Sequence, residues 1–587
     1  MNEKQEIFGH PKGLYICFLT EMWERFSFYG MKFLLLLYLT KYHLFTDSGS
    51  LDVLGAYAGL VYALPVIGGM LADRYLGMRK AVIFGGILLC FGHLGLAFEG
   101  EQATIVNDVT VQDDFALNIF YLSLALIIVG VGFLKPNIST IVGKLYEVGD
   151  ERRDSGFTIF YMGINLGSFT ATLLCGYLGE NYGWGYGFGL AGIGMLLGLV
   201  VFLWGQKFLH GHADPDNPEV LKENGFLGIN KEMTIYLASF VSVPVIWFLV
   251  QSNSIVHSTL NLMAFAVLIW LIWFLYKECN KVERGRMIVL ASLTLFTVVF
   301  WALFEQSAAS MTLYADRVVD RVLVNTTFLP TETTGLYIMA FLLIMIPLVT
   351  GFMGRQKFQE MNDSERKITG GLFVITSLTM IYFGIDAIGF AGDVAESASG
   401  LPVRWEVTAV QTGSLNAMFI FLLAPLFAWL WTFLGKNKIE PGTPLKFGLG
   451  ILQAGLGFGA LVLGATMPDA SGKVAYIWIV LAYLLHTTGE LCLSPVGLSA
   501  VTKLSVPKVV GFMMGVWFLA TAYSELVAAQ IAKFAAIDTD AGIVTDVAAA
   551  STVYAEFFSS LMWVGVAISV VLFVLAPFMK KSMHGVN

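Results

Sequence analysis

The sequence contains little charge. Only 13% of its 587 residues are Asp, Glu, Lys or Arg, whereas an average soluble domain carries about 25%. Hydrophobic residues make up 56% of the chain, and the mean hydropathy is +0.72. These residues cannot supply the polar surface of a soluble protein, and disorder requires low hydrophobicity and many charges. The composition therefore predicts an integral membrane protein.

Cysteine is scarce, and the net charge is not basic. None of the five cysteines lies in a CxxC pair or a Cys/His cluster, so we expect neither disulfides nor metal ligands. The net charge of −8 argues against a nucleic-acid partner, which would require a basic surface. The N-terminus lacks the pattern of a signal or transit peptide.

Long apolar runs are abundant. A membrane helix needs about 20 mostly apolar residues, and the chain contains sixteen such runs. They lie at approximately 14–40, 52–72, 80–99, 118–142, 157–179, 187–206, 233–251, 258–277, 287–315, 335–354, 369–391, 413–435, 447–467, 474–499, 509–535 and 553–579.

The distribution of Lys and Arg tests this assignment, because cytoplasmic loops of membrane proteins collect basic residues. With a cytoplasmic N-terminus, 26 of the 35 Lys and Arg fall on the inner side and six on the outer side. Adding or removing one span would invert every later loop and destroy this asymmetry. We therefore expect a multi-pass protein of the cytoplasmic (inner or plasma) membrane with both termini in the cytoplasm.

Three basic residues remain within the predicted spans: Arg25, Lys32 and Lys135. A charge at the bilayer centre costs about 2.5–3.5 kcal/mol even on insertion scales, so such residues face a protein interior or a wet cavity. On a helical wheel, one face of the first span about 140° wide carries Glu21, Glu24, Arg25, Tyr29 and Lys32. This face is either an ion-pair network that only joins helices or the charged wall of a substrate cavity; four ionisable groups favour the cavity.

Two further acids, Glu305 and Glu490, lie deep in predicted spans. Together with the acids of the first span they outnumber the three bases by one. A carboxylate without a full partner takes up a proton readily in a low-dielectric site, as proton-coupled transport requires. Glu525 is a weaker candidate that reaches toward the outer surface, and His486 is best interpreted as a hydrogen-bonded structural residue.

The loop after the second span has the pattern GxLADRxxGxRK, which comprises Gly69, Asp73, Arg74, Gly77, Arg79 and Lys80. Small residues permit a tight turn, and the charges can bind neighbouring helices. The alternative is an ordinary basic inner loop. The pattern resembles the loop signature of the major facilitator superfamily, in the position where that superfamily has it.

Four motifs narrow the resemblance to the proton-dependent oligopeptide transporter family. They are ExxERF in the first span, Gly132-Phe-Leu-Lys135-Pro136-Asn137-Ile-Ser, Phe160-Tyr161-Met-Gly-Ile-Asn165-Leu-Gly167-Ser and Gly489-Glu490-Leu-Cys-Leu-Ser494-Pro495. With Phe-Trp301…Glu305-Gln306 and Gly515-Val-Trp517-Phe they cover nearly the whole chain. The resemblance implies an all-α major facilitator fold with twelve core helices in two six-helix halves.

The family pattern also implies a division of the chain. Residues 1–209 form the first half, 210–286 a linker with the extra helical pair of bacterial members, and 287–334 the seventh core helix. Residues 392–587 complete the second half. The segment 335–391 has no counterpart in the usual bacterial pattern, and we expect a peripheral helical hairpin there, which gives about sixteen spans in all.

The resemblance assigns roles to site residues. In the family, basic residues attract the peptide carboxylate, an acid receives the amino terminus and aromatic residues line the pocket. The substrate-binding residues are then Arg25, Tyr29, Lys32, Tyr62, Lys135, Tyr161, Asn165, Trp301, Asn416, Glu490, Ser494 and Trp517. The proton-coupling residues are Glu21, Glu24, Arg25 and Glu305. Two salt bridges between the halves, Lys32–Glu305 and Lys135–Glu490, can alternate as the cavity opens.

The chain departs from the family pattern at four positions. Phe28 replaces a common tyrosine, and Lys32 replaces an arginine, so a point charge replaces a bidentate fork. Gly55 occupies the place of a histidine that handles protons in some relatives, which leaves the coupling to carboxylates. Ala417 replaces the proline that commonly follows Asn416.

The function implied is import of di- and tripeptides by proton symport, with small peptides, protons and the lipid bilayer as partners of a monomer. One alternative is a transporter of another anion or zwitterion, such as nitrate or an amino-acid conjugate; Glu490 speaks against a simple anion. The other is a membrane enzyme or a peptide-sensing receptor. No nucleophile–base pair, metal cluster or phosphate loop in the sequence supports an enzyme.

Overall fold

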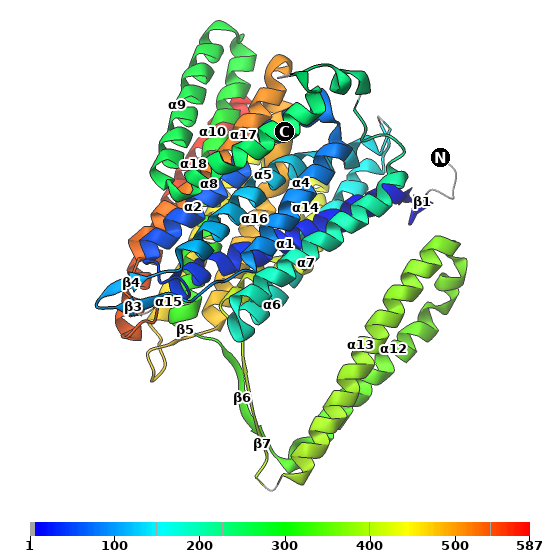
Figure 1. Ribbon diagram of the computed structural model, residues 1–587, viewed down its shortest axis with the longest axis vertical. Coiled ribbons are helices and arrows are strands. Elements are labelled where there is room, and N and C mark those ends of the chain that lie inside the picture. Colours follow the sequence, from blue (N-terminus) through cyan, green and yellow to red (C-terminus); the bar gives the residue numbers. More distant parts are fainter. Residues whose placement is uncertain are drawn as a thin grey trace. The chain divides into compact units, whose positions relative to one another are not determined.

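The computed structural model describes residues 6–147, 149–215, 217–225, 228–397, 399–540 and 542–586, without the side chains of residues 360, 364, 494–496 and 498. The chain forms two compact units. One consists of Met1–Lys12 and Val322–Val407, and the other of Gly13–Arg321 and Thr408–Asn587. Figure 1 follows the chain through both units by colour.

The larger unit contains the helices of both predicted halves. Its first part consists of α1 (Lys12–Lys41), α2 (Asp47–Ala63), α3 (Pro65–Leu71), the π-helical turn η2 (Ala72–Leu76), α4 (Met78–Leu96), α5 (Asp114–Lys144), α6 (Arg153–Tyr182) and α7 (Trp184–Gly205). After the short 3-10 turns η3 (Gln206–Leu209) and η4 (Pro218–Lys222) comes a helical pair, α8 (Lys231–Gln251) and α9 (Asn253–Lys277).

The second part of the larger unit begins with α10 (Lys281–Phe304), the 3-10 turn η6 (Glu305–Ala308) and α11 (Ser310–Arg317). It continues after the smaller unit with η8 (Val410–Gly413), α14 (Ser414–Lys436), α15 (Thr443–Ala465), α16 (Ile477–Leu504), η9 (Pro507–Val509), α17 (Val510–Ala532), η10 (Lys533–Ala535) and α18 (Val547–Ser582).

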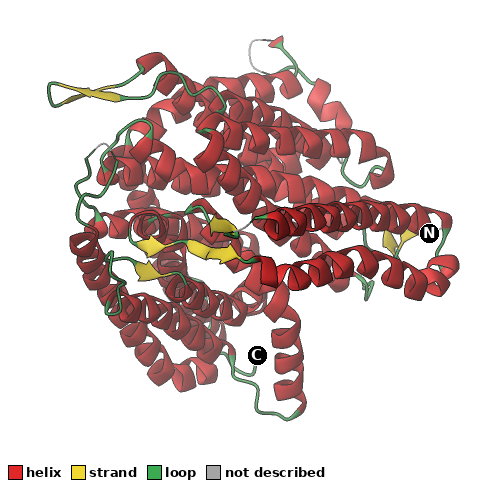
Figure 2. Cartoon of the chain, turned by 90° about the horizontal axis from the view of Figure 1, so that it is seen from below, coloured by secondary structure: helices red, strands yellow, loops and turns green. Residues whose placement is uncertain are grey.

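Strands are short, as the small yellow segments in Figure 2 show. β1 (Glu6–Ile7) pairs with β2 (His10–Pro11), and β3 (Thr104–Val106) with β4 (Val109–Val111), both antiparallel. β5 (Val319–Asp320) pairs in parallel with β8 (Val474–Ala475).

Each of the sixteen predicted spans coincides with a helix or with a helix and its adjoining turns. Fourteen helical segments of the described chain are long and apolar enough to cross a membrane. The two other spans are α1 and α16. α1 carries several charged residues along its length, and the described apolar part of α16 is limited to Ile477–Leu493. Both helices contribute residues to the predicted site.

Glycines permit close packing of these helices. A Cβ built on Gly85 of α4 would lie 2.5 Å from the carbonyl oxygen of Gly130 on α5, so only glycine fits there. A Cβ on Gly455 of α15 would lie 3.1 Å from the Cα of Gly565 on α18. Gly455 and Gly565 therefore form a helix-packing contact between α15 and α18.

Two predicted spans are interrupted. Residues 52–72 divide between α2 and α3, because Pro65 has no N–H to continue the hydrogen bonding of α2 and instead begins the next helix. Residues 287–315 divide into α10, η6 and α11, with Ala309 outside helical geometry at φ −116° and ψ −105°. The second break falls at Glu305, which places this carboxyl group at the end of a helix.

Besides β1 and β2, the smaller unit contains β6 (Val322–Phe328), η7 (Pro330–Glu332), α12 (Thr333–Glu360), α13 (Asp363–Glu396) and β7 (Leu401–Glu406). β6 and β7 pair antiparallel from Val322 opposite Glu406 to Phe328 opposite Leu401. Leu336, Ala391 and Val394 form a small buried cluster. α12 and α13 cover the predicted hairpin 335–391, but the two strands are additional. The predicted division of the rest of the chain remains a prediction.

Candidate functional site

One part of the predicted site is a buried ion-pair cluster on α1. Arg25 Nε lies 2.9 Å from Glu21 Oε1 and 2.7 Å from Glu24 Oε2. The three side chains are at most 4% exposed. A close approach of α6 encloses this cluster, since a Cβ on Gly167 would lie 3.0 Å from the Arg25 Cβ. One guanidinium therefore faces two carboxylates, as the wheel predicts.

Lys32 lies about two turns further along α1 and contacts the other half of the protein. Its Nζ donates to Glu305 Oε2 at 2.8 Å and to Glu525 Oε1 and Oε2 at 2.8 and 3.1 Å. Glu305 belongs to η6 and Glu525 to α17. The Lys32–Glu305 bridge that the resemblance implies is formed in this structure. A single ammonium joins two carboxylates across the halves.

The contact with Glu525 differs from the expectation that this residue reaches toward the outer surface. Its side chain is 4% exposed. The helical wheel of α17 alone does not reveal this role, because its neighbours are set by how the halves pack. Counting Glu525, five buried or half-buried acids face three bases, and the excess of carboxylates is two rather than one.

The second implied bridge, Lys135–Glu490, is not among the ion pairs of the described residues. Lys135 Nζ lies instead 3.9 Å from the centroid of the Tyr62 ring, a cation–π contact within the first half. Glu490 Oε2 accepts a hydrogen bond of 3.0 Å from Asn416 Nδ2. The same amide donates to Thr487 Oγ1 at 3.0 Å, which joins α14 to α16.

Other predicted substrate residues vary in exposure. Trp517 is 6% exposed and packs close to Gly497, whereas Tyr161 is 51% exposed. Asn165 donates to the backbone carbonyl of Tyr161 at 3.2 Å. Tyr29 packs edge-to-face on Phe28 with ring centroids 5.2 Å apart.

Two further residues that are predicted to bind the substrate belong to the second half. Trp301 is half-buried and packs edge-to-face on Phe304, with ring centroids 5.2 Å apart. The side chain of Ser494 lies outside the described residues. The assignment of these aromatic and polar groups to peptide binding remains a prediction.

His486 is structural, as expected from the sequence. Its Nε2 lies 3.0 Å from the carbonyl oxygen of Ala454, and the ring is 1% exposed. The Phe458 ring packs edge-on against it at 4.8 Å. Nothing in this arrangement brings the ring to the acid one turn later on α16.

A second group of contacts between the halves lies at the end of the molecule where α1 ends and α2 begins, the predicted outer end. Arg317 binds Asp47 through two hydrogen bonds of 2.6 and 2.7 Å, and both side chains are 2% exposed. Lys41 Nζ lies 2.5 Å from Asp316, and Lys533 Nζ lies 2.5 Å from Asp52. We call these three pairs the outer ion pairs. They join the first half to the second.

The loop motif lies at the other end of α2. Gly77 has φ +73°, in the left-handed region, and a Cβ there would collide with the Pro215 backbone. Arg79 Nε lies 2.5 Å from Asp214 Oδ1. Lys80 Nζ lies 2.7 Å from Glu232 on α8. These two bases bind the neighbouring segments as predicted.

Three other residues of the loop motif have simpler environments. Asp73 and Arg74 are exposed. Gly69 faces the Pro136 ring, since a Cβ on Gly69 would lie 3.4 Å from the Pro136 Cβ. The turn thus depends on its glycines and on the bases that follow them.

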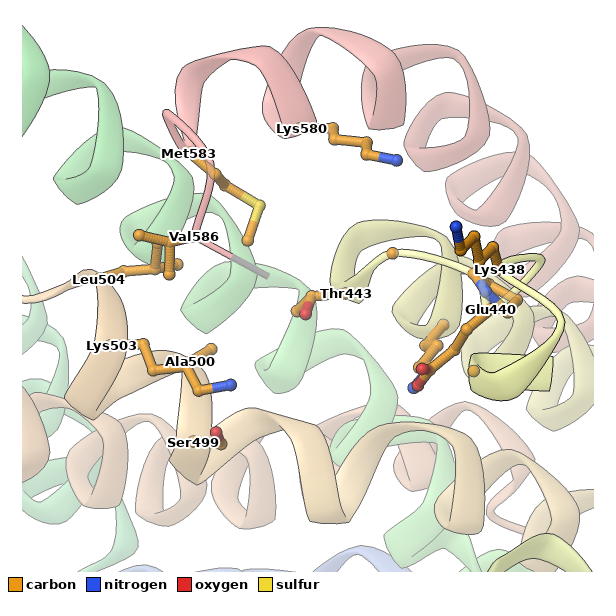
Figure 3. Close-up of a pocket in the computed structure, with 14 residues that line it drawn as sticks. Lys438, Glu440, Thr443, Ser499, Ala500, Lys503, Leu504, Lys580, Met583 and Val586 are labelled. Atoms are coloured by element: carbon orange, nitrogen blue, oxygen red, sulfur yellow. The ribbon is translucent and has the colours of Figure 1, made fainter. Parts of the chain in front are cut away.

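A cavity of about 530 Å³ lies apart from the charged site, among the ends of α14, α15, α16 and α18 (Figure 3). Its lining includes Lys438, Lys446, Lys503 and Lys580. Lys446 is paired with Glu440 at 2.5 Å. None of the predicted site residues lines it, so we place the functional site at the charged residues of α1 and their partners. Within the described part of the chain no group of His, Cys, Asp or Glu could bind a metal ion.

Comparison with known proteins identifies the architecture. The family model described as "POT family" matches residues 79–403 and 401–547. The chain belongs to the POT family. The peptide transporter YePEPT of Yersinia enterocolitica is 33% identical over 89% of this chain and 88% of its own length. A di-/tripeptide transporter of Lactococcus lactis is 29% identical over 90% of each chain.

Solved structures of POT transporters extend the similarity to the whole fold. A mutant of the peptide transporter POT in complex with alafosfalin has 30% sequence identity and a TM-score of 0.71, with 99% of this chain and 97% of the other covered. A POT family transporter in complex with 5-aminolevulinic acid has 25% identity and a TM-score of 0.70. The expected major facilitator fold is confirmed, and the relatives are transporters rather than enzymes.

Proposed function

We propose that this POT family member imports di- and tripeptides across the cytoplasmic membrane by proton symport. Relatives named as peptide or di-/tripeptide transporters support the substrate class. The observation that carries the proposal is the buried contact of Lys32 with Glu305 and Glu525 across the two halves. Protonation of carboxylates in this contact would change the attraction between the halves, which is the coupling that a symporter requires.

A peptide carries opposite charges at its two ends, and the site offers both signs. Glu490, oriented by Asn416, would bind the amino terminus. Arg25, Lys32 and Lys135 would attract the carboxylate. Lys135 contacts Tyr62 rather than a carboxylate, so a peptide carboxylate would gain its charge without first displacing an ion pair. Tyr29, Tyr161, Trp301 and Trp517 would contact the side chains, and Asn165 would add a hydrogen bond.

Transport would proceed by rocking of the halves about a site near the membrane midplane. The outer ion pairs and the Lys32–Glu305 bridge would close the outer side, which corresponds to a state open toward the cytoplasm. Formation of Lys135–Glu490 would accompany the opposite state. Glu21 and Glu24, which share Arg25, would exchange protons with the cavity.

The positions of Lys and Arg support the orientation of the protein in the membrane. We propose that both termini lie in the cytoplasm, that the protein works as a monomer in the bilayer and that it needs no cofactor besides the proton gradient. A membrane potential of 100 mV would add about 2.3 kcal/mol for each charge moved inward.

Uptake of a labelled dipeptide into proteoliposomes tests the proposal. We expect accumulation with an inward proton gradient, equilibration without one, and competition by unlabelled dialanine. Uptake that ignores the gradient would contradict proton coupling but leave the peptide substrate in place. Failure of dialanine to compete, with competition by nitrate or an amino-acid conjugate, would replace the substrate class.

A further inference from the structure

Glu525 occupies an interface between the two halves. It lies near the middle of α17, which packs along α2 and α10. One turn further along α17, Ala529 meets Gly55 of α2 so closely that a Cβ on Gly55 would lie 2.8 Å from the Ala529 Cβ. Glycine at position 55 thus brings α17 against the first half and lets Glu525 reach Lys32 on α1.

Glu525 is surrounded mainly by neutral groups and by groups that also interact with Lys32. Titratable or charged groups that interact with it from the neighbouring elements are Lys32, Glu305, Tyr57, Tyr62 and Lys135. It accepts two hydrogen bonds from the Lys32 ammonium, and its carboxyl group is also in hydrogen-bond contact with that of Glu305. The carboxylate is as deeply buried as the ammonium, 4% and 3% exposed, whereas the Glu305 side chain is 16% exposed.

The charges of Lys32, Glu305 and Glu525, which we call the triad, do not balance. One ammonium between two ionised carboxylates leaves a net charge of −1 in a site with little water, which is costly. One proton on either carboxylate makes the triad neutral. With a proton on Glu305, the more exposed acid, Lys32 still has Glu525 as an ionised partner in the second half. Only a second proton, on Glu525, leaves Lys32 without a charged partner there.

We infer that Glu525 is a second proton-coupling residue, whose protonation releases Lys32 from the second half after Glu305 has taken up the first proton. The inference rests on the proposed symport. Both protons come from the outer water, each forms an O–H bond on a carboxylate, and both leave to the cytoplasm when Lys32 returns. The freed ammonium then faces the cavity, where the peptide carboxylate can bind it. The cycle accordingly moves at least two protons through this triad.

The test measures the peptide gradient at which net flux stops in proteoliposomes, with a fixed pH difference and the membrane potential clamped at zero. Each coupled proton contributes a tenfold gradient per pH unit, since one unit corresponds to about 1.36 kcal/mol. We expect at least a hundredfold gradient per pH unit for the unaltered protein and a tenfold smaller one for Glu525→Gln. Counterflow exchange of peptide should persist in Glu525→Gln, because Gln still accepts a hydrogen bond from Lys32.

The matched control is Glu556→Gln, the same change at an exposed position of α18, which should reproduce the unaltered gradient. Glu525→Asp, which keeps a titratable group, should restore at least part of the lost gradient. An unchanged balance point in Glu525→Gln overturns the inference, since a merely structural role would not set the stoichiometry. Should Glu525→Gln fail to fold, a balance of only tenfold per pH unit in the unaltered protein overturns it equally. Complete indifference to the pH difference would instead refute the proposed symport itself.

Discussion

The outer ion pair between Asp47 and Arg317 offers a sharp test of alternating access. Both side chains are 2% exposed, and the carboxylate accepts two guanidinium hydrogen bonds as well as the backbone N–H of Ile537. Asp47→Asn removes the negative charge and leaves Arg317 buried without compensation. Removal of one partner of a buried pair costs about 3–5 kcal/mol. The penalty applies to the state closed at the outer end, because opening exposes Arg317 to water.

We therefore expect Asp47→Asn to shift the equilibrium toward the outward-open state by about 10²- to 10⁴-fold, since each 1.36 kcal/mol is tenfold. Spin labels at Val109→Cys and Met467→Cys can measure this shift of the equilibrium. These residues are 63% and 60% exposed and follow helices of opposite halves at the predicted outer end. The five native cysteines are buried and leave the background low. The measured distance distribution should move to longer values in Asp47→Asn.

Asp52→Asn is the matched control on the same helix. Asp52 and Lys533 are 35% and 25% exposed, and such pairs contribute about 0–1 kcal/mol, so this variant should shift the equilibrium less than about fivefold. The double variant Asp47→Asn/Arg317→Gln should recover much of the closed population, because no buried charge remains. Equal distributions for Asp47→Asn and Asp52→Asn would refute the reasoning.

Three further outcomes follow from the site and its surroundings. Glu24→Gln should abolish gradient-driven uptake and retain counterflow; full driven uptake would remove Glu24 from the proton path. Glu490→Gln should raise the KM for dipeptides by about 10- to 100-fold, the value of a hydrogen bond to a charged group, and an unchanged KM would place the amino terminus elsewhere. At the end of α1, burial lowers the pKa of His43 to about 4. Because the unfolded chain takes up this proton near pH 6.5, stability should fall by about 2 kcal/mol from pH 7 to pH 5. His43→Phe should flatten this loss in thermal unfolding scans at both pH values; a slope equal to that of the unaltered protein would contradict it.

The sequence predicts the spans well, because hydropathy is a local property that fourteen helical segments of the described chain follow. It predicts the charged face of α1 for the same reason, since the spacing of Glu21, Glu24, Arg25 and Lys32 alone sets their angles. Contacts between distant helices are not local. The position of Glu525 depends on how α17 packs against α2 at Gly55, and no wheel of α17 contains that information. The break of α10 at Glu305 likewise could not be predicted from a proline, because the sequence has none there.

The strands of the smaller unit bring the two ends of the segment 322–407 together. β6 and β7 pair so that Val322, where the unit begins, lies opposite Glu406, where it ends. The two ends of the segment 322–407 are therefore neighbours in one strand pair. A short turn between residues 321 and 408 could replace this segment with every later helix still in its original orientation.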